Sequence, residues 1–268
     1  MTNNPEPIRL NKHLATVLGV SRRQADELIE QGRVKINHQP AIIGQKITPN
    51  DQITVNNQPL QVQNRPQLIA INKPTGVTCS RRHQKGDRTI YDLLPKQLHH
   101  LKTVGRLDKN SSGLILMASD GDFIHRMTHP SFQKTKVYKV RLDLDLAPLH
   151  QQMINDFGVV LADGRSQLQL SRLSDEHRRD WQVTMSEGRN RQIRRTFSAL
   201  GYEVIKLHRI QFGPYQLTSL KPGEFTIIKW LPKITKMCYN IKELLSYEKI
   251  ITQYRYYRSS QRRQKLTV

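Results

Sequence analysis

Residues 105–116 read Gly-Arg-Leu-Asp-Lys-Asn-Ser-Ser-Gly-Leu-Ile-Leu and join a charged turn to an apolar run. The carboxylate of this stretch, Asp108, lies among cations in a chain whose formal net charge is +21. An aspartate just before Ser-Ser-Gly is typical of a turn or a helix cap. It is also typical of a charged group that acts on a bound polyanion. Spacing alone leaves both interpretations open.

The whole chain is strongly basic. Its 268 residues include 43 lysines and arginines against 22 aspartates and glutamates. Such a balance favours binding to nucleic acid or to an anionic membrane. The membrane is disfavoured, because no run approaches the roughly 18 apolar residues of a spanning helix and the N-terminus lacks an apolar signal core. We therefore expect a cytoplasmic protein that binds nucleic acid.

Cofactor and metal signatures are weak in this sequence. Cys79 and Cys238 form no close-spaced pair, which argues against a disulfide scaffold or a cysteine-based zinc site and favours a reducing cytoplasm. The ten histidines are scattered. The sequence contains neither a GxGxxG pattern nor a P-loop. We expect no nucleotide cofactor and no metal ion.

Residues 8–63 are predicted to form a small separate module after an extension of residues 1–7. Apolar residues at helical spacing predict two consecutive helices, which end at Gly19 and Gly32. Ser21 followed three residues later by Gln24 is a capping-box pattern that starts the second helix. Alternating residues then predict short strands at 33–36 and 52–55.

The cations of this module are concentrated where its second helix begins and its first strand follows. They could form an ordinary solvated face, but the absence of balancing acids near Arg22 and Arg33 favours contact with phosphates. The segments 21–25 and 32–37 resemble the RNA-binding domain named after ribosomal protein S-four. In that family they present a helix and a strand to structured RNA. The candidate RNA-binding residues here are Lys12, Arg22, Arg23, Arg33 and Lys35.

Residues 64–67 are polar and predict a linker to a larger domain of residues 68–231. Its strand patterns and helix patterns alternate irregularly along the chain. We predict strands at 68–71, 114–118, 136–142, 168–173 and 182–185, and helices near 123–127, 149–157 and 190–200. This order predicts an α+β domain with a mixed, largely antiparallel central sheet flanked by helices.

The basic, tyrosine-rich tail of residues 232–268 has two open interpretations. It is either a frayed terminus or an arm that folds when it binds RNA.

Two further segments carry candidate functional residues. In the strand pattern of residues 136–142, Tyr138 shares a face with Val140 and predicts an inward side chain. It is either a core residue or a ring that stacks on a flipped-out base. In residues 186–195 the arginines lack interleaved acids, so an arginine here could keep Asp108 ionised and oriented.

Three motifs occur together and in order: Gly-Arg-Leu-Asp at 105–108, Lys-x-Tyr at 136–138 and Gly-Arg-Asn-Arg-Gln-Ile-Arg-Arg at 188–195. This set resembles the family of ribosomal small-subunit pseudouridine synthase A and its large-subunit relatives. The resemblance implies that Asp108 is catalytic, that Tyr138 stacks on the target uracil and that Arg194 pairs with the aspartate. Residues 73–76 resemble a Lys-Pro-x-Gly segment of the family, for which we expect a structural role.

The activity implied by this resemblance is the site-specific conversion of uridine to pseudouridine in ribosomal RNA, without a metal or other cofactor. We expect a monomer that acts on ribosomal RNA or on an assembly intermediate. Residues 79–95 resemble the large-subunit relatives and residues 207–209 the small-subunit enzyme, and we favour large-subunit RNA. Further candidate RNA contacts around the site are Arg106, Arg189, Arg191 and Arg195.

Two alternatives are a non-catalytic, ribosome-associated RNA-binding or assembly protein and a metal-dependent nuclease. The first would explain the charge but not the ordered motifs. The second would need clustered carboxylates, which are not evident between Arg106 and Arg194.

Overall fold

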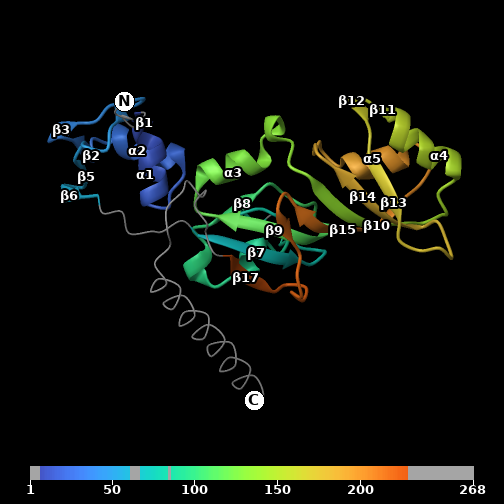
Figure 1. Ribbon diagram of the computed structural model, residues 1–268. Helices are drawn as coiled ribbons and strands as arrows, with labels where there is room; N and C mark the ends of the chain where they lie inside the picture. The colour runs from blue at the N-terminus through green and yellow to red at the C-terminus, as the bar shows by residue number, and fades with distance from the viewer. Residues whose placement is uncertain (1–6, 61–66, 84–85, 229–268) are drawn as a thin grey trace, which may run out of the picture. The chain divides into compact units, whose positions relative to one another are not determined.

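The computed structural model describes residues 7–60, 67–83 and 86–228 (Figure 1). The predicted extension 1–7 and linker 64–67 lie almost entirely outside these residues, and the predicted tail 232–268 lies wholly outside them.

The N-terminal module contains two helices packed on short strands. The capping box forms as predicted, because Ser21 Oγ accepts from Gln24 N while the Gln24 side chain accepts from Ser21 N. Leu14, Ala25 and Val34 are completely buried and join the helices to the strands. In chain order the elements are β1 (Ile8–Arg9), α1 (Leu10–Val17), α2 (Arg22–Glu30), β2 (Val34–Ile36), β3 (Gln39–Pro40), β4 (Lys46–Ile47), β5 (Ile53–Val55) and β6 (Gln58–Pro59).

The larger domain is built on one nine-stranded sheet. Seven strands follow the order β13-β14-β10-β15-β9-β7-β17, and β16 and β8 pair with β15 and β9. Among the described residues, the parallel strand pair of this sheet is β9 with β15, and the other pairs are antiparallel. The strands are β7 (Leu68–Lys73), β8 (Lys102–Val104), β9 (Ser112–Ala118), β10 (Lys136–Leu142), β13 (Gln169–Arg172), β14 (Asp180–Met185), β15 (Val204–Phe212), β16 (Tyr215–Gln216) and β17 (Phe225–Ile228).

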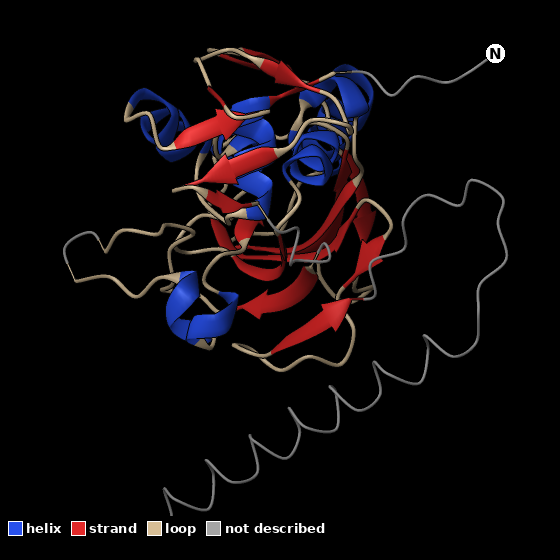
Figure 2. Cartoon of the chain, turned by 90° about the vertical axis from the view of Figure 1, so that its left-hand side faces the viewer, coloured by secondary structure: helices blue, strands red, loops and turns tan. Residues whose placement is uncertain are grey.

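Helices cover both faces of this sheet. Alternate residues of β7 and β9 bury their side chains on opposite faces, as pleating requires. Ile69 and Ile115 share one core with Phe197 of α5 (Gln192–Ser198), and Leu68 and Leu114 share another with Met127 of α3 (Gly121–Thr128). The predicted α+β fold, with its mixed and largely antiparallel sheet, is therefore confirmed. The curved strands are seen in Figure 2.

The helix predicted near 149–157 is split. It consists of α4 (Pro148–Gln152) and a π-helical turn (Met153–Phe157), followed by the hairpin β11 (Val159–Leu161) and β12 (Gly164–Ser166). Three short 3₁₀ turns complete the regular structure, at Ile90–Leu93, Lys96–Leu98 and Pro130–Phe132.

Strand β15 was not predicted, yet it joins the two halves of the sheet between β9 and β10. Its pairing with β10 is interrupted by two β-bulges. One bulge leaves Ile210 between the pairs Val137–Gln211 and Tyr138–Arg209, and the other leaves Ile205 unpaired. Each bulge inserts a residue and changes which side chains face inward. Buried residues therefore occur at positions 204, 207, 209 and 212 instead of at every second position.

No helix among the described residues combines the length and the apolar character needed to cross a bilayer.

Candidate active site

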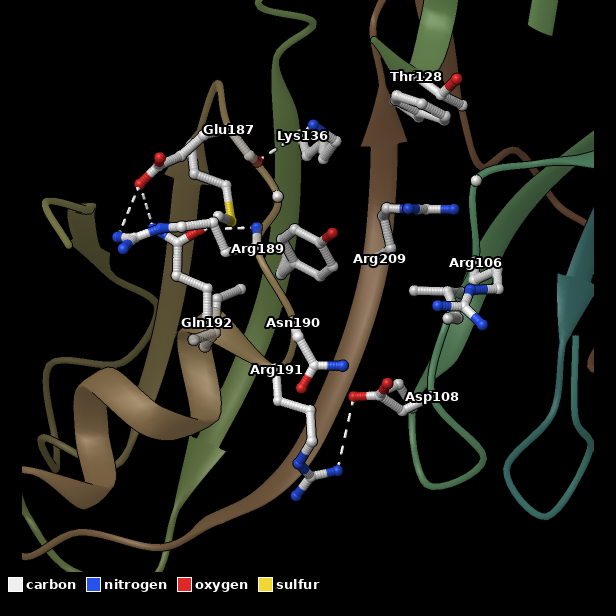
Figure 3. A pocket seen from close by; sticks show the side chains of 18 of the residues that line it. Arg106, Asp108, Thr128, Lys136, Glu187, Arg189, Asn190, Arg191, Gln192 and Arg209 are labelled. Atoms are coloured by element: carbon white, nitrogen blue, oxygen red, sulfur yellow. Dashed lines mark hydrogen bonds and ion pairs between the residues drawn. The ribbon is translucent and has the colours of Figure 1, made fainter. Parts of the chain in front are cut away.

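Asp108 lies in the loop that connects β8 to β9. The loop turns back on itself where Ser111 N donates to Asp108 O at 3.0 Å. The Asp108 side chain is 37% exposed and lines a cavity of about 710 Å³. Figure 3 shows its carboxylate directed toward Arg191 across the cavity.

Lys73 forms hydrogen bonds to this loop through its side chain. It ends β7 with its side chain fully buried, and its Nζ donates to Ser111 O at 2.6 Å and to Pro74 O at 2.9 Å. Burial lowers the pKa of Lys73 to about 8, against the opposing effects of Cys79 and Asp108. The Lys-Pro-x-Gly segment thus binds main-chain carbonyls of the loop, in keeping with the structural role we expect for it.

Arg191, and not Arg194, lies at ion-pair distance from the aspartate. Arg191 Nη1 is 3.6 Å from Asp108 Oδ2. Arg194 instead donates to Val204 O at 2.5 Å and to Asn110 O at 3.1 Å. The expected pairing of Arg194 with Asp108 is therefore wrong. Arg194 instead binds a backbone carbonyl of the Asp108 loop and one of β15.

Asp108 nevertheless affects the pKa of Arg194. Burial lowers the pKa of Arg194, Arg191 lowers it further, and Asp108 opposes both. Arg194 thus lies within electrostatic reach of Asp108 without an ion pair.

Tyr138 lies on β10 and is 7% exposed, with its side chain among the residues that line the cavity. Its neighbours across the sheet are Val183 on β14 and Arg209 on β15. Leu107 and Ile193 also belong to both the cavity wall and the adjoining core. The cavity therefore combines an apolar wall with the carboxylate of the loop.

Arg209 is a cavity residue that sequence reasoning did not single out. It is 2% exposed, its Nε donates to Leu114 O at 2.8 Å, and its guanidinium lies 4.8 Å from the Phe212 ring centre. The bulge at Ile210 allows Arg209 and Phe212, three residues apart, to line the same cavity. The bulge has no sequence signature, so the pattern alone could not place these side chains.

Gly113 permits the close approach of β15 to β9. It pairs with Arg209 and has a φ of +102°, and a Cβ added there would lie 2.2 Å from Arg209 O. Neither the backbone conformation nor the space admits a side chain.

The cavity is strongly cationic. Seven lysine and arginine side chains line it, against the carboxylates of Asp108 and Glu187. Such a surface suits a polyanionic ligand. The seven cations are Arg106, Lys109, Lys134, Lys136, Arg189, Arg191 and Arg209.

Four of the predicted RNA contacts form ion pairs within the protein: Arg191 with Asp108, Lys12 with Asp122, and Arg189 and Arg195 with Asp163. The last two share one carboxylate. Arg195 donates to both carboxylate oxygens of Asp163, and Arg189 Nη1 donates to Asp163 Oδ1 at 2.9 Å. Arg195 and Arg189 lower the pKa of Asp163. The arginine cluster, which has no acid between its members, thus receives one from the β11–β12 hairpin. RNA contacts by these two residues stay a prediction.

The predicted RNA contacts outside the arginine cluster lie on exposed or partly exposed positions. Arg106 is exposed at the edge of the cavity. Arg22 and Arg23 begin α2 and are exposed, and Arg33 Nε donates to Asn56 Oδ1 at 2.7 Å. Lys12 on α1 and Lys35 on β2 are half-buried.

The described part of the chain contains no group of three histidine, cysteine, aspartate or glutamate side chains placed to hold a metal ion. Cys79 lies at the cavity wall, where its Sγ accepts from Leu107 N at 3.4 Å. Burial raises the pKa of this thiol. It is therefore a neutral wall residue at pH 7.

Comparison with known proteins shows which families the chain matches. Residues 8–53 match the S4 domain, and residues 67–199 match the RNA pseudouridylate synthase family. Ribosomal large subunit pseudouridine synthase B of Bacillus subtilis is 33% identical over 221 residues, which cover 81% of this chain and 90% of that protein. Ribosomal small subunit pseudouridine synthase A of Yersinia pestis is 34% identical over 220 residues, which cover 81% and 93%.

A solved structure described as a pseudouridylate synthase covers 83% of this chain and 96% of its own, with a TM-score of 0.59 and 31% sequence identity. Sequence and fold agree, and this chain belongs to the RNA pseudouridylate synthase family.

Proposed function

We propose that this protein converts a specific uridine of ribosomal RNA to pseudouridine, with Asp108 as the catalytic carboxylate. The observation that carries the proposal is the position of Asp108 in a cationic cavity whose wall contains Tyr138. Carboxylates serve at sugar anomeric centres because they stabilise developing positive charge there and can form a covalent intermediate. Family membership supports this assignment.

The reaction is balanced within the substrate. The bond between N1 of uracil and C1′ of ribose breaks, the base turns, and C5 bonds to C1′. The proton that leaves C5 is balanced by the proton that N1 gains. Asp108 assists the first cleavage at C1′, and no oxidant, reductant or second substrate is consumed.

The cavity walls suit a base taken out of an RNA helix. The cavity volume of about 710 Å³ lies within the range of small-molecule sites. An inward aromatic ring can stack on an extruded base of any identity, so Tyr138 would hold the uracil while it turns. Arg191 would orient the carboxylate, and Arg194 would fix the loop through Asn110.

The N-terminal module would bind structured RNA through the exposed start of α2 and through β2. Most of the affinity would come from phosphate contacts and would therefore fall with salt. We place the enzyme in the cytoplasm as a monomer that acts on ribosomal RNA or an assembly intermediate.

The target lies in large-subunit RNA, as favoured by the resemblance of residues 79–95. The relatives at 33% and 34% identity carry names of both subunits, so the mapped position decides the matter. Pseudouridines should be mapped in ribosomal RNA from cells with and without this protein. Loss of one large-subunit pseudouridine on deletion is expected. An unchanged map in both subunits would overturn the proposed function.

The Asp108→Asn variant separates catalysis from binding. It should bind ribosomal RNA from the deletion strain as tightly as the wild type and form no pseudouridine in it. Asp180→Asn is the matched control, because Asp180 pairs with Arg141 on β10 and does not line the cavity. That control should keep full activity, whereas an active Asp108→Asn enzyme would refute the catalytic role.

Parallel incubations of ribosomal RNA with the enzyme, one in EDTA and one with added Mg²⁺, test both alternative functions. Isomerisation without strand cleavage is expected. Cleavage that requires a divalent metal would support the nuclease. Tight binding with neither reaction, under conditions in which the deletion strain's RNA is the substrate, would support the non-catalytic RNA-binding protein.

A further inference from the structure

Three aromatic rings form an exposed cluster beside the cavity, at the last turn of α3 and in the segment that follows it. The ring centres of His125 and His129 are 4.7 Å apart, and that of Phe132 lies 5.9 Å from the first and 6.3 Å from the second. All three residues are exposed, and Phe132 retains 41% of its surface. None of them has a role in the reaction steps proposed above.

The chain fixes this cluster in place before any ligand binds. His129 Nδ1 accepts from Ser131 N at 3.3 Å and lies 2.8 Å from Ser131 Oγ. Phe132 N donates to His129 O at 3.1 Å, and Gln133 then takes a left-handed backbone conformation with a φ of +42°. A preformed surface loses little conformational entropy when it binds a partner.

The cluster is continuous with the cavity and is flanked by cations. His129 and Lys134 both line the cavity, and Lys134 Nζ lies 5.9 Å from the Phe132 ring centre. Arg126 is exposed on the last turn of α3. Rings with cations beside them match the two parts of a nucleotide, because bases stack on rings and phosphates attract lysine and arginine.

We propose that Phe132, His125 and His129 form a stacking surface for a nucleobase adjacent to the flipped uridine in the RNA strand. The inference rests on the proposed function, which places the target uridine in the cavity. A base on Phe132 would have its phosphate near Lys134. The cluster thereby holds the strand where it leaves the cavity and contributes to the choice of target.

Steady-state kinetics with ribosomal RNA from the deletion strain test the role of the ring face. Phe132→Leu keeps an apolar side chain but removes the ring, and should raise KM about tenfold with kcat unchanged. Phe132→Trp should keep the wild-type KM. Phe157→Leu is the matched control, because Phe157 is 63% exposed and does not line the cavity, and its KM should not change. A KM for Phe132→Leu within twofold of the control would overturn the proposal.

Fluorescence tests stacking without turnover. The chain has two tryptophans of its own, so the emission of the Phe132→Trp variant is compared with that of the wild type. At low salt, an oligouridylate should quench the variant more than the wild type, while an abasic oligonucleotide with the same number of phosphates should not. Equal quenching by both would show phosphate contact without stacking and would overturn the proposal, as would no quenching by either when both bind. If the wild type modifies no uridine, the proposed function fails, whereas this measurement still reports on stacking.

Discussion

Lys73 Nζ lies 2.6 Å from the carbonyl oxygen of Ser111, so a fully buried ammonium is bonded to the loop that carries Asp108. A third acceptor of the same ammonium, Lys109 O, is 3.4 Å away and also accepts from Gly76 N. These bonds join the end of β7 to the loop. The position of the carboxylate in the cavity is thus coupled to the core of the sheet.

The buried ammonium predicts an unusual dependence of stability on alkaline pH. Desolvation lowers the pKa of Lys73 in the folded protein to about 8, whereas the unfolded value is near 10.5. Between these values the unfolded state binds the extra proton, so the contribution of Lys73 to stability is present above the unfolded pKa and is lost as pH falls through 8. The free energy of unfolding should therefore gain about 2 to 3 kcal/mol from this group between pH 7 and pH 10.

Urea unfolding of the wild type and of Lys73→Met at several pH values measures this gain as a difference. The difference isolates Lys73 from the other groups that titrate in the same range. A pH-independent difference would show that the Lys73 pKa is not lowered.

Arg191 and Arg194 should differ in what their loss affects. The ion pair of Arg191 with Asp108 is half exposed and contributes little to stability. Arg191→Gln should therefore lower kcat about tenfold through the orientation of Asp108, with Tm unchanged. Arg194→Gln leaves the carbonyls of Val204 and Asn110 without their charged donor and should cost about 2 kcal/mol of stability as well as activity.

Thermal unfolding and single-turnover rates of both variants check this division. An Arg191→Gln enzyme with wild-type kcat, beside a stable but inactive Arg194→Gln enzyme, would restore Arg194 as the functional partner of Asp108.

Gly113→Ala should be severely destabilising. The new methyl would meet Arg209 O at 2.2 Å, and the φ of +102° is unfavourable for alanine. Steric overlap and backbone strain together should cost about 3 kcal/mol or more, measured by urea unfolding. Gly121→Ala is the control, because Gly121 begins α3 and has no heavy atom within 4 Å of the added Cβ. It should be neutral or slightly stabilising, and equal losses in both variants would contradict the argument.

The sequence predicted the parts of this fold in which local patterns agree with the tertiary structure. The capping box at Ser21 and the alternation around Tyr138 both depend on residues a few positions apart. Strand β15 could not be found in that way. Its bulges at Ile205 and Ile210 shift the inward positions, so Leu207 and Phe212 do not follow a period of two.

The sequence also could not predict which acidic and basic residues pair. Glu187 and Glu203 are the acids nearest in sequence to the arginine cluster, but the partner of Arg195 is Asp163 on a hairpin 32 residues away. The partner of Asp108 differs from the prediction for a similar reason: the sequence indicates Arg194, but Arg191, three residues earlier, lies at ion-pair distance. Arg191 takes a left-handed conformation with a φ of +45° just before α5, and this conformation has no signature in the pattern.

RNA binding should weaken steeply with salt, and Arg22 should contribute to that dependence. Arg22 is exposed at the first position of α2, and the protein carries a net charge of +21. Each lost phosphate contact lowers the slope of log K against log salt by about 0.9, so Arg22→Ala should reduce the slope by about one. Titrations of ribosomal RNA at several salt concentrations measure it. Arg179→Ala, which removes a surface arginine paired with Asp145, is the control and should keep the wild-type slope. An unchanged slope for Arg22→Ala would remove this residue from the RNA contacts.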